Sequence, residues 1–406
     1  MATNKHRDEH EGLREKVAEQ LNDVFKEHGV KGLLTKVRKN LDEWKNVPLN
    51  IAVTGDTGAG KSSYINTVLG LTGDDEGAAK VGVVETTDAC TRYPHPEHRN
   101  LILWDLPGIG TTKFPQETYV QKVDFEKYDF FLIFSSGRFT ENDMWLAEQV
   151  KSLGKRFYFI RTKIDLDIMN DKRAHPKNHL AKNVEDEIKS HTLQQLQHKF
   201  DKPVVFLINN FNKDEFDFEA LTVRLIEDSP NIKKEALALS LTSLTEGIIR
   251  EKEKYLKKRI YIVSVASAIA GAVPIPGVGT AVDASILLEE AVFYRRQLQL
   301  DDASLKKDAN DLNITLDDLK RKMKLTSSFI RFTITGLLTY LSRIGLSNIA
   351  EKVLTIAIPV VGSLAAAGLS YGTQVYCLKK LLKVMVEDAI SLHKKKAIMM
   401  AEIINI

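Results

Sequence analysis

With 406 residues, 27% of them charged and 43% apolar, the chain has the length and composition of an ordinary soluble protein of two domains. The formal net charge of +3 and the lack of a basic tract with interleaved aromatic residues exclude the usual nucleic-acid-binding classes. With 2 cysteines, Cys90 and Cys377, and no apolar signal core after Met1, we expect a cytoplasmic protein rather than a disulfide-stapled secreted one.

The first predicted elements are two amphipathic helices over residues 9–46, broken near Gly29. Leu13, Val17 and Leu21 recur on one face, and lysine and glutamate residues crowd the other. We interpret this pair as packing on another domain rather than lying on a membrane surface.

From Val47 onward, short apolar strands alternate with helical segments. The predicted strands cover residues 49–53, 101–104, 130–134, 157–160 and 204–208. This alternation predicts an α/β fold, with a mostly parallel sheet and helices on both faces. Residues 178–200 predict a polar outer helix. Four histidines near it are interpreted as surface residues rather than metal ligands: His175, His179, His191 and His198.

A phosphate-binding loop, GDTGAGKS at residues 55–62, follows the first strand and precedes a helix. Gly58 and Gly60 let main-chain N–H groups surround phosphate oxygens, and the helix N-terminus adds partial positive charge. Lys61 supplies a full charge to the outer phosphates, and the Ser62 hydroxyl can bind Mg²⁺. The residues predicted to contact the nucleotide here are Gly58, Ala59, Gly60, Lys61, Ser62 and Ser63.

The segment of residues 77–87 has the place of a mobile loop. Such a loop carries a threonine whose hydroxyl completes the Mg²⁺ shell when a γ-phosphate is present. Thr86 and Thr87 both qualify, and the sequence does not separate them. Gly82 is predicted to contact the nucleotide.

A second motif, D-L-P-G at residues 105–108, follows the strand at 101–104. Asp105 therefore lies at the carboxyl end of a strand, where a Mg²⁺-binding carboxylate belongs, and Gly108 can turn its N–H toward the γ-phosphate. Small GTPases with an intrinsic catalytic glutamine carry it directly after this motif, where this chain has Ile109. Either hydrolysis is slow, or another residue or a partner molecule positions the attacking water.

A third motif, T-K-I-D at residues 162–165, follows the strand at 157–160. The Asp165 carboxylate can accept two hydrogen bonds from guanine N1–H and its exocyclic amine, which adenine cannot offer as a pair. Thr162 and Lys163 complete the motif, with the aliphatic stem of Lys163 along the purine. Asn209 and Asn210 follow the last strand, where a final loop would contact the base.

After about residue 230 the strand pattern ends and helices continue to the end of the chain. Residues 260–282 and 353–378 carry no charge and are each long enough to span a bilayer. Proline and glycine interrupt both runs, at residues 274–277 and 359–362. We interpret them as buried helical hairpins, with membrane insertion as the alternative.

Together these motifs and their flanking helices resemble the interferon-inducible immunity-related GTPases, a dynamin-like family. The likeness rests on residues 55–62, 77–87, 104–110 and 157–165. Within that family, Lys61 would mark the GKS subgroup. Two positions depart from the pattern, because Val81 stands where a nucleotide-contacting threonine is expected and Asn209 replaces a serine.

The resemblance implies a Ras-like GTPase domain over residues 48–230 and a helical domain built from residues 1–47 and 231–406. It also implies Mg²⁺-dependent hydrolysis of GTP to GDP and self-assembly with the same chain or related GTPases. A further implication is attachment to intracellular or pathogen-vacuole membranes in cell-autonomous immunity. Glu85 would act across the dimer on the facing nucleotide. The predicted catalytic residues are Lys61, Glu85, Asp105 and Gly108. Two alternatives stay open, a slow GTP-gated switch that docks a partner and an integral membrane GTPase.

Overall fold

A computed structural model describes residues 2–82, 89–109, 114–243, 245–271, 278–341, 343 and 371–404. The chain divides into two compact units, one of residues 44–248 and one that combines residues 1–43 with 249–406. Compactness does not by itself define folding domains, so the domain limits predicted after residues 47 and 230 stay a prediction.

The unit of residues 44–248 is built on a six-stranded sheet with the order β2-β3-β1-β4-β5-β6. Only β2 runs antiparallel, to β3, and the other neighbours are parallel. The strands are β1 (Leu49–Gly55), β2 (Thr91–Pro94), β3 (Leu101–Asp105), β4 (Phe130–Ser135), β5 (Arg156–Arg161) and β6 (Val205–Leu207). All five strands expected from the sequence are therefore confirmed, with small changes at their ends.

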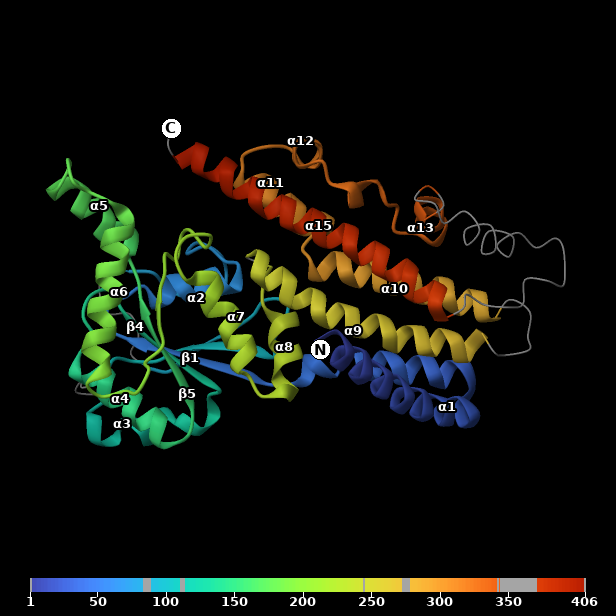
Figure 1. Cartoon of the computed structure of the whole chain (residues 1–406), viewed down its shortest axis with the longest axis horizontal. Coiled ribbons are helices and arrows are strands. Elements are labelled where there is room, and N and C mark those ends of the chain that lie inside the picture. The colour runs from blue at the N-terminus through green and yellow to red at the C-terminus, as the bar shows by residue number, and fades with distance from the viewer. Residues whose placement is uncertain are drawn as a thin grey trace. The chain divides into compact units, whose positions relative to one another are not determined.

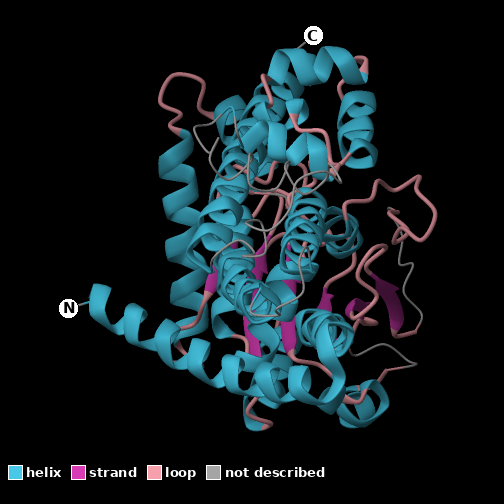
Figure 2. Cartoon of the chain, turned by 90° about the vertical axis from the view of Figure 1, so that its right-hand side faces the viewer, coloured by secondary structure: helices cyan, strands magenta, loops and turns pink. Residues whose placement is uncertain are grey.

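Helices cover both faces of this sheet, as the sequence pattern predicts (Figure 2). They are η1 (Glu43–Asn46), α2 (Lys61–Leu69), α3 (Gln116–Val123), η2 (Phe125–Lys127), α4 (Glu141–Ser152), α5 (Ile164–Ala174), α6 (Ala181–Gln197), α7 (Phe218–Asp228) and α8 (Asn231–Ser240). On one face, Phe131 and Phe159 pack in a buried cluster with side chains of α3, α4 and α6. On the other face, Tyr64 of α2 lies against Phe134 and Phe218, with ring centroids 5.1 and 5.9 Å away.

The edge strand β2 is missing from the sequence prediction. Its residues are exposed or half-buried, so they lack the apolar run that marks the other strands. Pro94 ends it at an edge, which is where a sheet tolerates proline.

The second unit is helical throughout its described residues (Figure 1). Its helices are α1 (Ala2–Asp42), α9 (Glu246–Gly271), α10 (Val278–Gln297), α11 (Asp302–Asp311), α12 (Leu316–Met323), η3 (Thr326–Phe329), α13 (Ile334–Leu341) and α15 (Tyr371–Ile404). The predicted break in the first helix is confirmed, because Gly29 has the non-helical angles φ 62° and ψ −163°. Arg259 of α9 joins three helices of this unit. Its guanidinium pairs with Glu290 of α10 at 2.7 Å and donates to the carbonyl of Leu41 in α1 at 2.8 Å.

The first uncharged run forms a buried antiparallel hairpin of α9 and α10, as predicted. Lys252 Nζ donates to Gln297 Oε1 at 3.1 Å, and further along the same pair of helices the Ser267 hydroxyl bonds the Asp283 carboxylate. Val263, Ala266 and Ala270 are buried. The turn at 272–277 and residues 353–370 of the second run lie outside the described residues. Among the described helices, none combines the length and the apolar character that crossing a bilayer requires.

Candidate functional site

The phosphate loop joins β1 to α2 at the carboxyl edge of the sheet, the usual binding edge of doubly wound folds. Its backbone has positive φ angles at Gly55, Gly58 and Gly60, which favour glycine. Gly55 has φ 123°, and a Cβ there would lie 2.0 Å from the Phe134 carbonyl oxygen. Gly58 has φ 77° and open space around it, so its main chain is accessible to a ligand.

The loop that follows β6, the last strand, is hydrogen-bonded to the phosphate loop and to α2. Asn210 Nδ2 donates to the Gly60 carbonyl at 2.9 Å, and Thr67 Oγ1 donates to the Asn210 carbonyl at 3.0 Å. A Cβ on Gly60 would come within 2.9 Å of that amide nitrogen. The prediction gave Asn210 a contact to the base, whereas the structure gives its amide a hydrogen bond to the phosphate loop.

Thr162 of the third motif makes an equivalent contact. Its hydroxyl donates to the Ala59 carbonyl at 2.8 Å, across 103 residues of sequence. The threonine side chain therefore points toward the phosphate loop. The two contacts bring the first motif, the third motif and the last loop into one site.

Lys61 opens α2, and its ammonium lies inside the loop. Nζ donates to the carbonyls of Gly55 and Asp56, each at 2.9 Å. Ser62 and Ser63 follow in the first helical turn and are half-buried. A cation and the amides of a helix N-terminus thus converge on the loop, the arrangement that binds phosphate.

The predicted guanine-reading residues begin α5. Lys163 has φ 60° and stands at the N-cap, exposed, so its stem is available to a purine. The half-buried Asp165 carboxylate makes no hydrogen bond or ion pair within the described part of the chain. Beneath them, Arg161 Nη2 pairs with Asp167 at 2.6 Å and fixes the start of the helix.

Asp105 ends β3 and is buried, with 2% of its surface exposed. The chain after it is held in place, because Leu106 N donates to the Val53 carbonyl at 2.9 Å and Tyr119 Oη donates to the Pro107 carbonyl at 2.8 Å. Gly108 is half-buried at the end of the motif.

Three of the predicted site residues lie outside the part of the chain that the structure describes. Glu85, Thr86 and Thr87 lie outside the described residues, so their predicted roles stay predictions. Gly82, the last residue described before them, is exposed. Asn209 bonds its own loop, since its Oδ1 accepts from Phe211 N at 2.9 Å.

Ile109, at the position of the absent glutamine, packs against the buried cluster of the sheet. Its main-chain carbonyl accepts a hydrogen bond from Asn142 Nδ2 of α4 at 3.5 Å.

Asp143, beside Asn142, was not among the site residues predicted from the sequence. It closes a capping box at the start of α4, accepting from Thr140 N at 2.8 Å and Thr140 Oγ1 at 2.9 Å. Burial raises the pKa of the Asp143 carboxyl to about 6, and Asp56 and Lys61 of the phosphate loop shift that pKa in opposite directions. The T-x-x-D pattern before an apolar helix was a usable signal for the cap, although nothing in it indicates the proximity to the loop.

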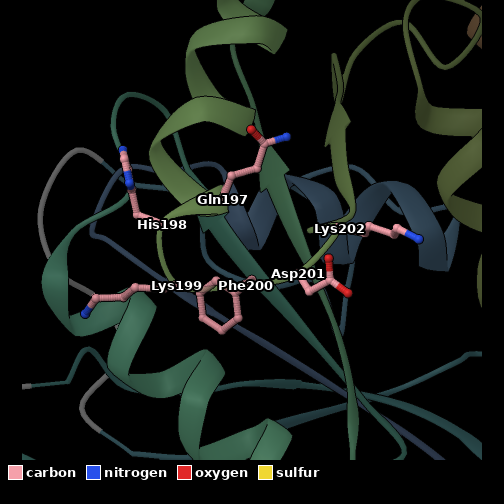
Figure 3. A pocket seen from close by; sticks show the side chains of 6 residues that line it. All are labelled: Gln197, His198, Lys199, Phe200, Asp201 and Lys202. Atoms are coloured by element: carbon pink, nitrogen blue, oxygen red, sulfur yellow. The ribbon is translucent and has the colours of Figure 1, made fainter.

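An open depression at the end of α6 contains none of these motif residues. It is lined by a single run, Gln197, His198, Lys199, Phe200, Asp201 and Lys202 (Figure 3). Phe200 is buried and belongs to the core, so the depression is a bend in the chain rather than a ligand site. The prediction of surface histidines is confirmed for His175, His191 and His198, which are exposed, while His179 is half-buried against Asp171.

The site residues fit a nucleotide with Mg²⁺. Asn210 Oδ1 is buried and has no hydrogen-bond partner among the described residues, which leaves an acceptor at the loop. Ser62 and Asp105 offer a hydroxyl and a carboxylate, the oxygen donors that Mg²⁺ prefers.

Comparison with known proteins gives a consistent result. A family model described as "Interferon-inducible GTPase (IIGP)" matches residues 14–396. T-cell-specific guanine nucleotide triphosphate-binding protein 2 of Mus musculus is 36% identical over 376 residues, which is 92% of this chain and 88% of that protein. Interferon-inducible GTPase 1 of Mus musculus is 38% identical over 290 residues, 71% of this chain and 70% of that protein.

Proposed function

The chain belongs to the interferon-inducible GTPase family, and on this premise we propose that it works in cell-autonomous immunity by GTP-dependent self-assembly on an intracellular membrane. Its chemistry is the hydrolysis of GTP to GDP and phosphate. The partner in assembly is a second copy or a related GTPase. Attachment to the membrane is peripheral, through the protein surface.

One observation carries the assignment of the site. The hydrogen bonds from Thr162 to Ala59 and from Asn210 to Gly60 tie the third motif and the last loop to the phosphate loop. A nucleotide whose phosphates lie on the loop amides therefore has its base directed toward Lys163 and Asp165.

In the proposed mechanism, Lys61 and the loop amides stabilise the negative charge that moves onto the phosphate oxygens. Ser62 and Asp105 would hold Mg²⁺, which neutralises charge on the outer phosphates when it is bound. Gly108 offers its N–H to the γ-phosphate, and Glu85 acts on the nucleotide of the facing molecule.

A second candidate function is a GTP-gated switch that turns over slowly and docks a partner. Ile109 favours it, because no glutamine is present after Gly108 to orient water. Turnover measured at high protein concentration separates the two functions, since a slow switch stays slow there.

The site is tested with Lys61→Ala in a nucleotide titration with Mg²⁺. We expect tight GTP binding to be lost, while Lys172→Ala on the exposed side of α5 binds as the wild type does. Circular dichroism checks that both variants are folded. Unchanged affinity in folded Lys61→Ala would refute the assignment.

A further inference from the structure

Phe329 is an aromatic residue held out in solvent. It ends η3 in the helical unit, and 80% of its surface is exposed. Its neighbours Leu325, Ser327 and Ile330 are all buried, so the turn can direct only the intervening side chains outward. Exposure of Phe329 therefore follows from the packing of the turn.

The turn is fixed by α15. The buried Asp388 carboxylate accepts from Thr326 N at 3.1 Å and Ser327 N at 2.5 Å, which caps the start of η3. About two turns further along α15, Lys395 Nζ donates to the Met323 carbonyl at 2.8 Å and holds the end of α12. Both flanks of the turn are thus hydrogen-bonded to the same long helix. These bonds to α15 fix the backbone that carries Phe329.

The charged residues that flank this phenylalanine in the sequence are basic. Every charged residue between 320 and 341 is basic: Lys320, Arg321, Lys322, Lys324 and Arg331. Lys320 is paired with Asp302 and Arg321 with Asp318. Lys322, Lys324 and Arg331 are exposed and make no side-chain hydrogen bond or ion pair within the described residues.

We infer that Phe329 with Lys322, Lys324 and Arg331 forms a surface that docks on an anionic membrane. This rests on the peripheral attachment in the proposed function and names the surface that makes it. An exposed aromatic ring partitions into the headgroup region, and exposed lysine and arginine residues within a few positions of it in the sequence are drawn to anionic lipid. The 41% exposed Ile334 at the start of α13 extends the apolar part of the surface. Charge complementarity favours an anionic membrane over a neutral one.

The test is flotation of the full chain with vesicles of phosphatidylcholine, alone or mixed with phosphatidylserine, in the GDP and GTP states. We expect the wild type to bind the mixed vesicles. Phe329→Ser and the triple variant Lys322→Glu, Lys324→Glu, Arg331→Glu should each bind about tenfold more weakly or worse. GTP hydrolysis without vesicles should not change.

Matched controls come from the other unit. Ile232→Ser removes an apolar side chain that is 75% exposed, and Lys172→Glu, Arg173→Glu, Lys177→Glu reverses three exposed basic residues. Both controls should bind vesicles as the wild type does. Phe329→Trp supplies a direct readout, because its added fluorescence should shift to the blue on binding if residue 329 enters the membrane.

Three outcomes would overturn the inference. If the Phe329 and triple variants bind like the wild type, this surface is wrong while membrane attachment stands. If the wild type binds neither kind of vesicle in either state, the surface and the attachment both fail, and the GTPase assignment is untouched. If the variants lose GTP-dependent assembly but keep vesicle binding, the surface contacts protein instead.

Discussion

Asn210 reaches across 150 residues of sequence to donate a hydrogen bond from Nδ2 to the Gly60 carbonyl, at 2.9 Å. The same residue accepts from Thr67 Oγ1 through its main chain. The last loop is thereby bonded to both the phosphate loop and the helix that follows it. These hydrogen bonds couple the position of the last loop to that of the phosphate loop when a nucleotide binds.

The first prediction tests this link. Asn210→Ala removes one partly buried hydrogen bond, so we expect GTP affinity to fall by about 1 kcal/mol, roughly fivefold. Asn183→Ala, on the exposed face of α6, is the matched control. Titration with a fluorescent GTP analogue measures both variants, and equal affinities would show that the contact does not shape the site.

The second prediction concerns base choice. Asp165→Asn removes a charged acceptor from guanine and provides an amide donor for the C2 carbonyl of xanthine. We expect GTP affinity to fall on the order of 100-fold and XTP affinity to rise. Asp201→Asn on the exposed turn after α6 should leave the preference for GTP intact. A variant that still prefers GTP would place the base elsewhere.

The sequence predicts the parallel strands well because each is a buried apolar run, such as β4, in which every residue is buried. It fails at β2, where exposure on the sheet edge removes the apolar signal. The break in α1 was also predictable, since Gly29 interrupts a regular amphipathic pattern.

The sequence predicts the motifs of the site but not the hydrogen bonds that connect them. Spacing identifies Thr162 and Asn210 as members of loops at the same sheet edge, yet their hydrogen bonds to Ala59 and Gly60 depend on how the strands pair. Asp143 shows the same limit, because only the tertiary structure brings it under the influence of Lys61.

The third prediction follows from the raised pKa of Asp143, which burial brings to about 6 in the folded protein. The unfolded chain has an ordinary carboxyl with a pKa of about 3.9. Between about pH 4 and pH 6 the Asp143 carboxyl therefore binds more protons in the folded state than in the unfolded state, so its own contribution to stability falls as the pH rises, by on the order of 3 kcal/mol in all.

Asp143→Asn cannot titrate but keeps an oxygen for the Thr140 bonds. Relative to the wild type, the variant should gain stability on going from about pH 4 to pH 7. Urea unfolding at several pH values measures this difference, with Glu187→Gln on exposed α6 as the control. A stability difference that stays constant with pH would mean that Asp143 titrates normally.

The fourth prediction addresses how water is positioned when Ile109 replaces a catalytic glutamine. If the missing group comes from a second molecule, GTP hydrolysed per molecule per minute must rise with protein concentration until assembly is complete. A dilution series with sizing in GDP and in GTP measures this directly. Lys61→Ala, which should not bind GTP, serves as the unassembled control. Activity per molecule that is flat across the series would exclude catalysis between molecules, because a group supplied by the same chain is present at every dilution.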